Sequence, residues 1–159
     1  QMRTFSCGKA EESYVQAMKA AEATAKEMGF SFKWYPQELK ECLVCDEDPL
    51  NNVFVTADGF VSPCVYLNLP LKVKRFPRFF CGKRYEVERL TFGNVNSESL
   101  LEIWEKQEYK EFREAFAKRS NVLPSWPLVD VEALAKLEEL LKDLPLPEPC
   151  RTCYKAYGV

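Results

Sequence analysis

The chain has 159 residues, of which 47% are hydrophobic and 29% charged, a composition typical of one packed domain or of one domain plus part of another. Its net charge of −2 argues against a nucleic-acid-binding surface, and no apolar run approaches the roughly 20 residues that span a bilayer. The start of the chain lacks the apolar core of a signal peptide. We therefore expect a cytoplasmic protein with neither a nucleic-acid nor a membrane partner.

The first part of the chain predicts a helix followed by a short strand. Residues 9–29 carry Tyr14, Met18 and Ala21 at helical spacing, and Gly29 stands where a C-cap glycine belongs. Apolar residues alternate over 30–35, which is typical of a strand. A helix and a strand in this order indicate the tail of a larger alternating α/β layout. Because the chain begins with Gln1, we expect it to be a piece of a longer protein.

A β-hairpin is predicted over residues 53–67. Its first strand lies at 53–55, Asp58 and Gly59 supply the turn, and the return strand carries Cys64. Residues 67–90 contain prolines and many basic side chains, which predicts an irregular loop with one strand at 85–92. The basic and aromatic residues of this stretch indicate a solvated loop, with nucleic-acid contact as the less favoured alternative.

Two more helices are expected in the second half. Ser99 and Glu102 have the spacing of a capping box at the start of one continuous helix that runs to about residue 120. The core-facing stripe of this helix consists of Leu100, Trp104, Phe112 and Phe116. Asp130 is the expected N-cap of a third helix, whose apolar face consists of Leu134, Leu137, Leu141 and Leu144. A proline-rich extended segment then completes the chain.

Seven cysteines and no histidine occur in the sequence, so a metal site in this chain would be built from thiolates. Five of them fall into three groups: Cys42 with Cys45 as C-x2-C, Cys64 after the hairpin turn, and Cys150 with Cys153 as a second C-x2-C. A C-x2-C unit places two sulfurs on one side of a tight turn, close enough to share a metal or a cluster. The remaining two, Cys7 and Cys81, lack a partner at such spacing and are interpreted as ordinary small side chains.

Spacing alone leaves the bound group open. Metal-free thiols and disulfides are the less favoured interpretations of two C-x2-C units in a reducing compartment. Four thiolates suit both zinc and an iron–sulfur cluster, and the wide separation of Cys64 from Cys150 favours the cluster only slightly.

Three stretches of the sequence resemble a known family. The pattern C-x13-G-x4-C from Cys45 through Gly59 to Cys64, the hairpin "VFVTADGFVSPC" and the helix entry "FGNVNSESLLEIW" are similar to the SPASM/twitch domain of radical S-adenosylmethionine enzymes. The resemblance implies an α+β fold, with a small β-hairpin cluster-binding core flanked by helices. It also implies two parts: residues 1–41 as the helix and strand that end a radical S-adenosylmethionine partial barrel, and residues 42–159 as the auxiliary-cluster domain.

The same resemblance implies the ligands. It assigns one auxiliary [4Fe–4S] cluster, for electron transfer or substrate positioning, to Cys45, Cys64, Cys150 and Cys153, with Cys42 as an alternative ligand. A second cluster is not expected, because the position six residues beyond Cys153 is Val159. Backbone amides of the hairpin turn and of residues 151–152 are the expected hydrogen-bond donors to the cluster.

The C-x3-C-x2-C motif that binds the S-adenosylmethionine-cleaving cluster is missing, since Glu38 stands where its first cysteine belongs. We therefore expect no catalysis by this chain alone and no catalytic residue in it. S-adenosylmethionine would bind in the remainder of a radical enzyme, an oxidoreductase or maturase, with a peptide or small-molecule substrate and ferredoxin or flavodoxin as electron donor. Two alternatives are a zinc-stapled module without redox role and a metal-free helical adaptor that binds a partner helix through its aromatic stripe.

Overall fold

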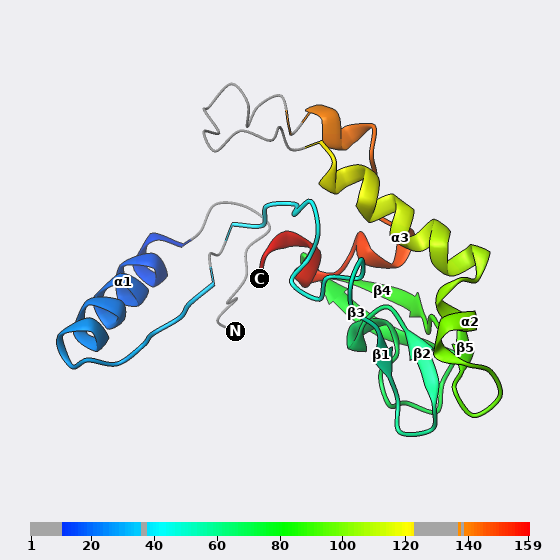
Figure 1. Cartoon of the computed structure of the whole chain (residues 1–159). Helices are drawn as coiled ribbons and strands as arrows, with labels where there is room; N and C mark the ends of the chain where they lie inside the picture. The colour runs from blue at the N-terminus through cyan, green and yellow to red at the C-terminus, as the bar shows by residue number, and fades with distance from the viewer. Residues whose placement is uncertain (1–10, 36–37, 123–136, 138) are drawn as a thin grey trace.

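The computed structural model describes residues 11–35, 38–122, 137 and 139–159. Within these residues the fold is α+β, as predicted: two small antiparallel sheets are flanked by helices. Figure 1 shows that helix α1 and the segment after it extend away from the strands and the other helices. Among the described helices, none is long and apolar enough to cross a membrane.

Helix α1 spans Glu12–Glu27 and confirms the first predicted helix. Gly29 follows it with φ of 74°, the left-handed conformation that ends many helices and that glycine adopts without strain. The predicted strand at 30–35 is wrong, because these residues pair with no neighbouring strand. Phe30 remains 66% exposed. An alternating pattern makes a strand only where another strand accepts its hydrogen bonds, and the described chain offers none here.

The predicted hairpin is confirmed. Strands β1, Phe54–Val55, and β2, Phe60–Ser62, pair antiparallel, with β5, Gly93–Asn94, on the other side of β2. Gly59 lies in the turn with φ of 86°, which requires glycine in practice. Cys64 differs from the prediction in one respect: it lies just beyond the end of β2 rather than within the strand.

A second hairpin occupies most of the stretch predicted as a loop. Strands β3, Arg75–Phe80, and β4, Lys83–Glu88, pair in full register. Their two-residue turn places Cys81 and Gly82 at φ of 52° and 71°, the conformation of the turns that best connect twisted strands. The sequence did not predict this hairpin, because Cys-Gly is not a common pair in two-residue turns. Pro77 fits within β3, since each strand of a two-stranded sheet has an unpaired edge.

The long predicted helix is two helices, α2, Leu100–Trp104, and α3, Gln107–Ser120. The Ser99–Glu102 capping box is present. Lys106 interrupts the helix with extended dihedral angles, and its ammonium donates to Phe92 O at 2.9 Å and to Glu98 Oε1 at 2.7 Å. These bonds anchor the break between the helices to residues on either side of β5.

The predicted stripe of this region is only partly buried. Phe116 is fully buried, Trp104 and Phe112 are half-buried, and Leu100 is exposed. Of the predicted third helix, residues 137 and 139–142 are helical, whereas its expected N-cap and first leucine lie outside the described residues.

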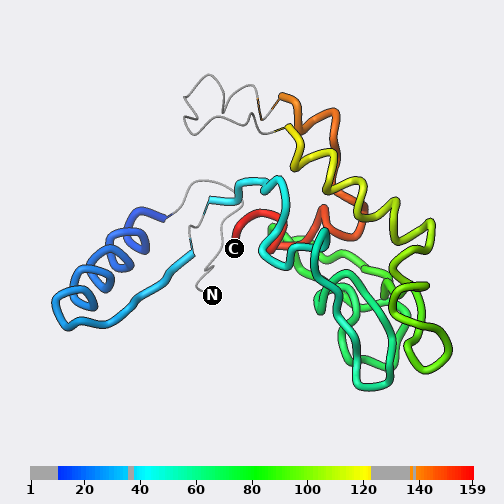
Figure 2. Tube along the Cα trace, in the orientation of Figure 1, coloured from blue at the N-terminus to red at the C-terminus, as the bar shows by residue number. Residues whose placement is uncertain are grey.

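The last segment is not extended as predicted but forms two short 3-10 helices, η2, Glu148–Cys150, and η3, Tyr154–Tyr157. A third one, η1, Val65–Leu67, follows Cys64. The main core joins this C-terminal segment to the β3–β4 hairpin and α3 through Leu67, Phe76, Val87, Phe116, Leu146, Cys150 and Ala156. In Figure 2 the loop after residue 38 lies beside this C-terminal segment. The two are joined by a hydrogen bond in which Cys42 N donates to Ala156 O at 2.9 Å.

Candidate metal centre

Cys45 lies in a loop closed by its own turns. Asp48 N donates to Cys45 O at 2.9 Å, and Asn52 N donates to Asp48 O at 2.8 Å. Asp48 adopts a φ of 42°, which short polar side chains tolerate better than most. The backbone amide of Glu47 lowers the pKa of the Cys45 thiol, against the larger effect of burial. The acidic stretch after Cys45 therefore forms a compact turn that holds this residue and favours its thiolate form.

Cys64 lies at the junction of β2 and η1. Its backbone is extended, as Ncap residues usually are, and the chain turns into η1 immediately after it. The backbone amides of Tyr66 and Leu67 lower the pKa of the Cys64 thiol against the larger effect of burial, and Leu67 N donates to Cys64 O at 3.3 Å. Ser62 Oγ also donates to Cys64 O, at 3.2 Å. The start of η1 thus places backbone N–H dipoles near the sulfur, and such dipoles favour its thiolate form.

Cys150 and Cys153 are placed by η2 and η3. Cys153 N donates to Cys150 O at 3.0 Å, which closes the turn between the two residues. Arg78 of β3 connects this segment with that of Cys64: its Nη1 donates to Pro149 O at 2.7 Å and its Nη2 to Tyr66 O at 2.8 Å. One guanidinium therefore holds together two cysteine segments that are far apart in sequence.

Four thiols from three segments lie close enough to act on one another. Burial raises the pKa of Cys64 to about 12, and the charges of Cys153 and Cys45 add to the rise. Burial, followed by the charges of Cys64, Cys153 and Cys45, raises the pKa of Cys150 well above its usual range. Burial and the charge of Cys153 also raise the pKa of Cys45. Such mutual repulsion is what a bound cation or cluster relieves.

Cys42 lies outside this group. Burial raises its pKa, and the charges that act on it are those of Asp46, Arg119 and Glu41 rather than those of other cysteines. Its thiol donates to Lys40 O at 3.7 Å, and a Cβ placed on Gly158 would lie 3.5 Å from its sulfur. The first C-x2-C thus separates its two sulfurs: Cys45 faces the other three, while Cys42 faces the C-terminal segment.

Arg119 fixes the loop that carries these two cysteines. It is fully buried at the end of α3, and its guanidinium donates to Leu43 O at 3.1 Å and to Cys42 O at 2.8 Å. It also donates to Leu144 O and forms a 2.7 Å ion pair with Glu41. A buried charge with this many partners is well compensated, so the loop is held by bonds that are costly to break.

The hairpin turn is held by β5 and the residues just after it. Asn94 Nδ2 and Asn96 Nδ2 both donate to Asp58 O, at 2.9 and 3.1 Å. A Cβ on Gly59 would collide with these two asparagine side chains, and one on Gly93 would collide with Glu98 and Ile103. Asn94 and Asn96 therefore pack closely against the hairpin turn that leads β2 toward Cys64, and we call this pair of asparagines the clasp of the turn.

Sequence reasoning missed several features of this centre. Arg78 and Arg119 gave no signal that was used, although Arg119 shares the face of Phe112 and Phe116 and a charge there indicates a buried partner. The expected amide donors are wrong in part: Gly59 N donates to Thr56 O and Arg151 N to Glu148 O.

The two unassigned cysteines have different outcomes. Cys81 is disulfide-bonded and so differs from the ordinary small side chain that was expected. Cys7 lies outside the described residues.

The residue set fits an iron–sulfur cluster in its chemistry, because it consists of thiols alone and backbone amides favour the thiolate forms of Cys45 and Cys64. Among the described residues, no three His, Cys, Asp or Glu side chains are close enough to hold a metal ion. A [4Fe–4S] cluster is larger than one ion and carries its four ligands around its outside.

Comparison with known proteins places this arrangement in a class. Residues 42–126 match SPASM, an iron–sulfur cluster-binding domain, and the match covers more than half of the chain. The chain belongs to this family of cluster-binding domains. It is similar to the tungsten-containing aldehyde ferredoxin oxidoreductase cofactor-modifying protein of Pyrococcus furiosus, at 32% identity over 88 residues. The aligned part is 55% of this chain and 23% of that relative, so the chain spans well under half of its length. No solved structure matches the chain.

Proposed function

We propose that this chain holds one auxiliary [4Fe–4S] cluster through Cys45, Cys64, Cys150 and Cys153. The observation that carries the proposal is the packing of Cys64 and Cys153 against the core cluster that contains Cys150, within a chain that matches a cluster-binding family. The charge of Cys45 supports it, because it raises the pKa of both Cys64 and Cys150. Cys42 is the less favoured ligand, because it lies among Asp46, Arg119 and Glu41 instead.

A cluster ligated by four thiolates supplies electron transfer or structural support, because each of its irons is already saturated by protein sulfur. Backbone amides and one arginine of the chain act on the cysteines that would hold the cluster. The amides of Glu47, Tyr66 and Leu67 favour the thiolate forms of Cys45 and Cys64, and amide dipoles beside the sulfurs of a cluster raise its reduction potential. The Arg78 guanidinium lowers the pKa of Cys150 against the dominant effect of burial, so its positive charge stabilises the thiolate form.

We also propose that the chain is the auxiliary-cluster part of a radical S-adenosylmethionine enzyme. Membership of the family supports this, as does similarity to a cofactor-modifying protein. In this proposal residues 42–159 form the cluster domain and residues 1–41 end the preceding barrel. The remainder of the enzyme binds S-adenosylmethionine and a peptide or small-molecule substrate, and ferredoxin or flavodoxin delivers electrons in the cytoplasm.

The test is metal content after purification without oxygen, measured for the parent chain and for four variants. About four irons and four sulfides per chain, with a broad brown absorbance, support the cluster. Cys153→Ala and Cys45→Ala are expected to lose most of the iron, whereas Cys42→Ala, the matched control from the same C-x2-C, keeps it. Cys81→Ala is a second control, which opens a disulfide at the β3–β4 turn without removing a proposed ligand.

Two results would overturn the assignment. One zinc per chain and no colour would leave a thiolate staple without redox role. Loss of iron from Cys42→Ala with iron retained in Cys45→Ala would keep the cluster but exchange its ligand.

A further inference from the structure

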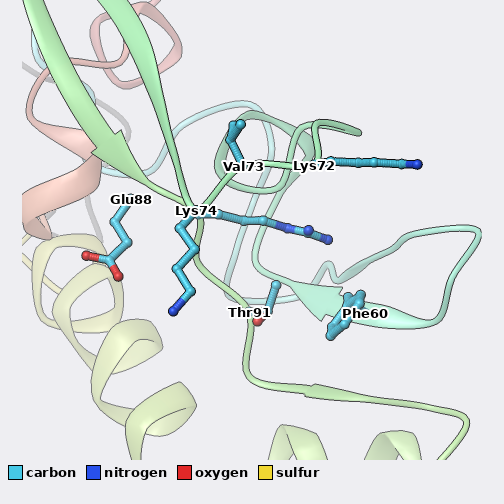
Figure 3. Close-up of a pocket in the computed structure, with 7 residues that line it drawn as sticks. Phe60, Lys72, Val73, Lys74, Glu88 and Thr91 are labelled. Carbon is cyan, nitrogen blue, oxygen red and sulfur yellow. The ribbon is translucent and has the colours of Figure 1, made fainter.

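A pocket of about 450 Å³ lies between the β1–β2 hairpin and the open end of the β3–β4 hairpin. Figure 3 shows its lining residues as sticks. The lining residues are Phe60, Lys72, Val73, Lys74, Glu88, Arg89 and Thr91. The free cysteines are not among them. The volume is that of a typical small-molecule site.

The charge of this pocket is positive although the chain as a whole is acidic. Three of its lining side chains are cationic and one is anionic. The anionic one, Glu88, already accepts from Arg75 at 3.4 Å. In Figure 3 it extends on the opposite side of Lys74 from Phe60 and Lys72. A ligand in the pocket therefore meets a local excess of about two positive charges.

Arg89 is held in one orientation. Its Nε donates to Asn68 Oδ1, and Asn68 is a fully buried polar residue. The guanidinium lies 4.9 Å from the centroid of the Phe60 ring, a cation–π contact. Arg89 also lowers the pKa of Asp58, to a lesser degree than the hydrogen bond from Thr56 does. A fixed guanidinium loses little conformational entropy when it binds an oxyanion through its terminal nitrogens.

We propose that this pocket binds the phosphate monoester of a small organic molecule. Arg89, Lys72 and Lys74 hold the phosphate, and Phe60 and Val73 contact the organic part. A phosphate monoester carries about −1.5 to −2 charges at neutral pH, which matches the excess of positive charge better than the single charge of a carboxylate. Planar guanidinium groups bind two phosphate oxygens at once, and the lysines add point charges.

The proposal goes beyond cluster binding and does not depend on it. Phe60 begins β2, the strand that ends before Cys64, so the pocket and the thiols lie at different ends of the same hairpin strand. A ligand held here would be carried by the cluster-binding domain itself. The pocket therefore assigns substrate or cofactor recognition to a domain whose thiols have another role.

The test measures binding of phenyl phosphate by calorimetry to the full chain purified without oxygen, with iron content recorded for each sample. Inorganic phosphate, benzoate and a short oligothymidylate are the comparison probes. Lys74→Gln removes one lining charge from an exposed position. Arg89→Lys keeps the charge but removes the planar guanidinium group that can bind two phosphate oxygens at once. Lys83→Gln, at the turn end of the same β3–β4 hairpin, is the control with equal loss of charge.

We expect phenyl phosphate to bind more tightly than either inorganic phosphate or benzoate. Arg89→Lys should weaken its binding about tenfold and Lys74→Gln about threefold, with Lys83→Gln unchanged. Equal weakening by Lys74→Gln and Lys83→Gln would overturn the proposal, since binding would then follow net charge alone. So would absence of binding at millimolar phenyl phosphate, or tighter binding of benzoate or of the oligothymidylate. Absent binding with normal iron content would reject the pocket and leave the cluster assignment standing.

Discussion

Helices α1 and α3 are of similar length but depend on the rest of the chain in opposite ways. Within the described chain α1 buries no residue, whereas α3 buries Tyr109, Phe116 and Arg119. The segment after α1 is also exposed, with Met28 at 64% and Phe30 at 66%. α1 is a product of local sequence alone, and α3 is a structural support of the cysteine loops.

The comparison explains which predictions succeed. A helix satisfies its hydrogen bonds internally, so the periodicity of residues 9–29 is enough to predict α1. A strand depends on a neighbour, so the alternation of residues 30–35 is not enough. The exposed apolar side chains of the segment after α1, such as Phe30, fit the proposal that this region ends a barrel whose remainder would cover them.

The largest expected effect is that of removing the cluster. Structural metal sites contribute on the order of 10 kcal/mol to folding, and ligation would join the segments of Cys45, Cys64 and Cys153. After chelation of iron without oxygen, we expect the amides of residues 150–159 to exchange freely while those of α1 exchange at an unchanged rate. Hydrogen exchange read by mass spectrometry on both segments checks this.

α1 serves as the internal control in that experiment. Retained protection of residues 150–159 in the iron-free chain would show that hydrogen bonds such as Cys42 N to Ala156 O hold the terminus without the cluster. Equal loss of protection in α1 would show that the two regions unfold together, which would remove the contrast between them.

The next effect is that of Arg119→Met. Methionine keeps much of the side-chain volume but leaves Leu43 O, Cys42 O and Leu144 O without their donor. Breaking a buried charge network of this kind costs about 3 to 5 kcal/mol, and the free energy of unfolding from denaturant titration measures it.

The matched control is Lys118→Met, which removes a charge from the exposed neighbouring position of α3 and should change stability by about 0.5 kcal/mol or less. A loss of stability as small for Arg119→Met would mean that the loop of Cys42 and Cys45 does not depend on the guanidinium. Iron content of the same variant then tells whether the cluster is lost together with the loop.

The features that the sequence predicts are divided in the same way, between those that depend on local sequence and those that depend on the rest of the fold. Asp58-Gly59 and the Ser99–Glu102 pair are local signals with local consequences, and the hairpin and the capping box are both present. The cysteine pattern predicted Cys45, Cys64, Cys150 and Cys153 as ligands, which stays a prediction. It did not decide between Cys42 and Cys45, because that choice depends on which sulfur faces the core and which faces Gly158.

The missed features are long-range. Arg78 joins Tyr66 to Pro149, and Arg119 joins the Cys42 loop to Leu144. Neither bond has a signature in sequence spacing, because the partners are backbone carbonyls of loops whose positions depend on the whole fold. The break between α2 and α3 is of the same kind, since it is fixed by bonds from Lys106 to the strand region.

The smallest expected effects come from two glycines, one in each region. Gly29 and Gly59 both have positive φ, 74° and 86°, so alanine is strained at either position by roughly 1 kcal/mol. Nothing lies within 4 Å of a Cβ on Gly29, whereas a Cβ on Gly59 collides with Asn94 and Asn96. Both asparagines donate to Asp58 O, so they cannot move away without loss of those bonds. We expect Gly59→Ala to cost about 2 kcal/mol and Gly29→Ala about 1 kcal/mol.

The two variants differ in where the cost appears. Gly59→Ala should lower the midpoint of denaturant unfolding of the cluster-binding region, whereas Gly29→Ala should raise only the exchange rates of the last turn of α1. Backbone strain is nearly the same at both positions, so the difference between them isolates the clasp of the asparagines on the hairpin turn. If the two substitutions lower the unfolding midpoint equally, the clasp contributes nothing and strain alone explains the glycine at position 59. If only Gly59→Ala lowers it, the turn before Cys64 is held by contacts that α1 does not have.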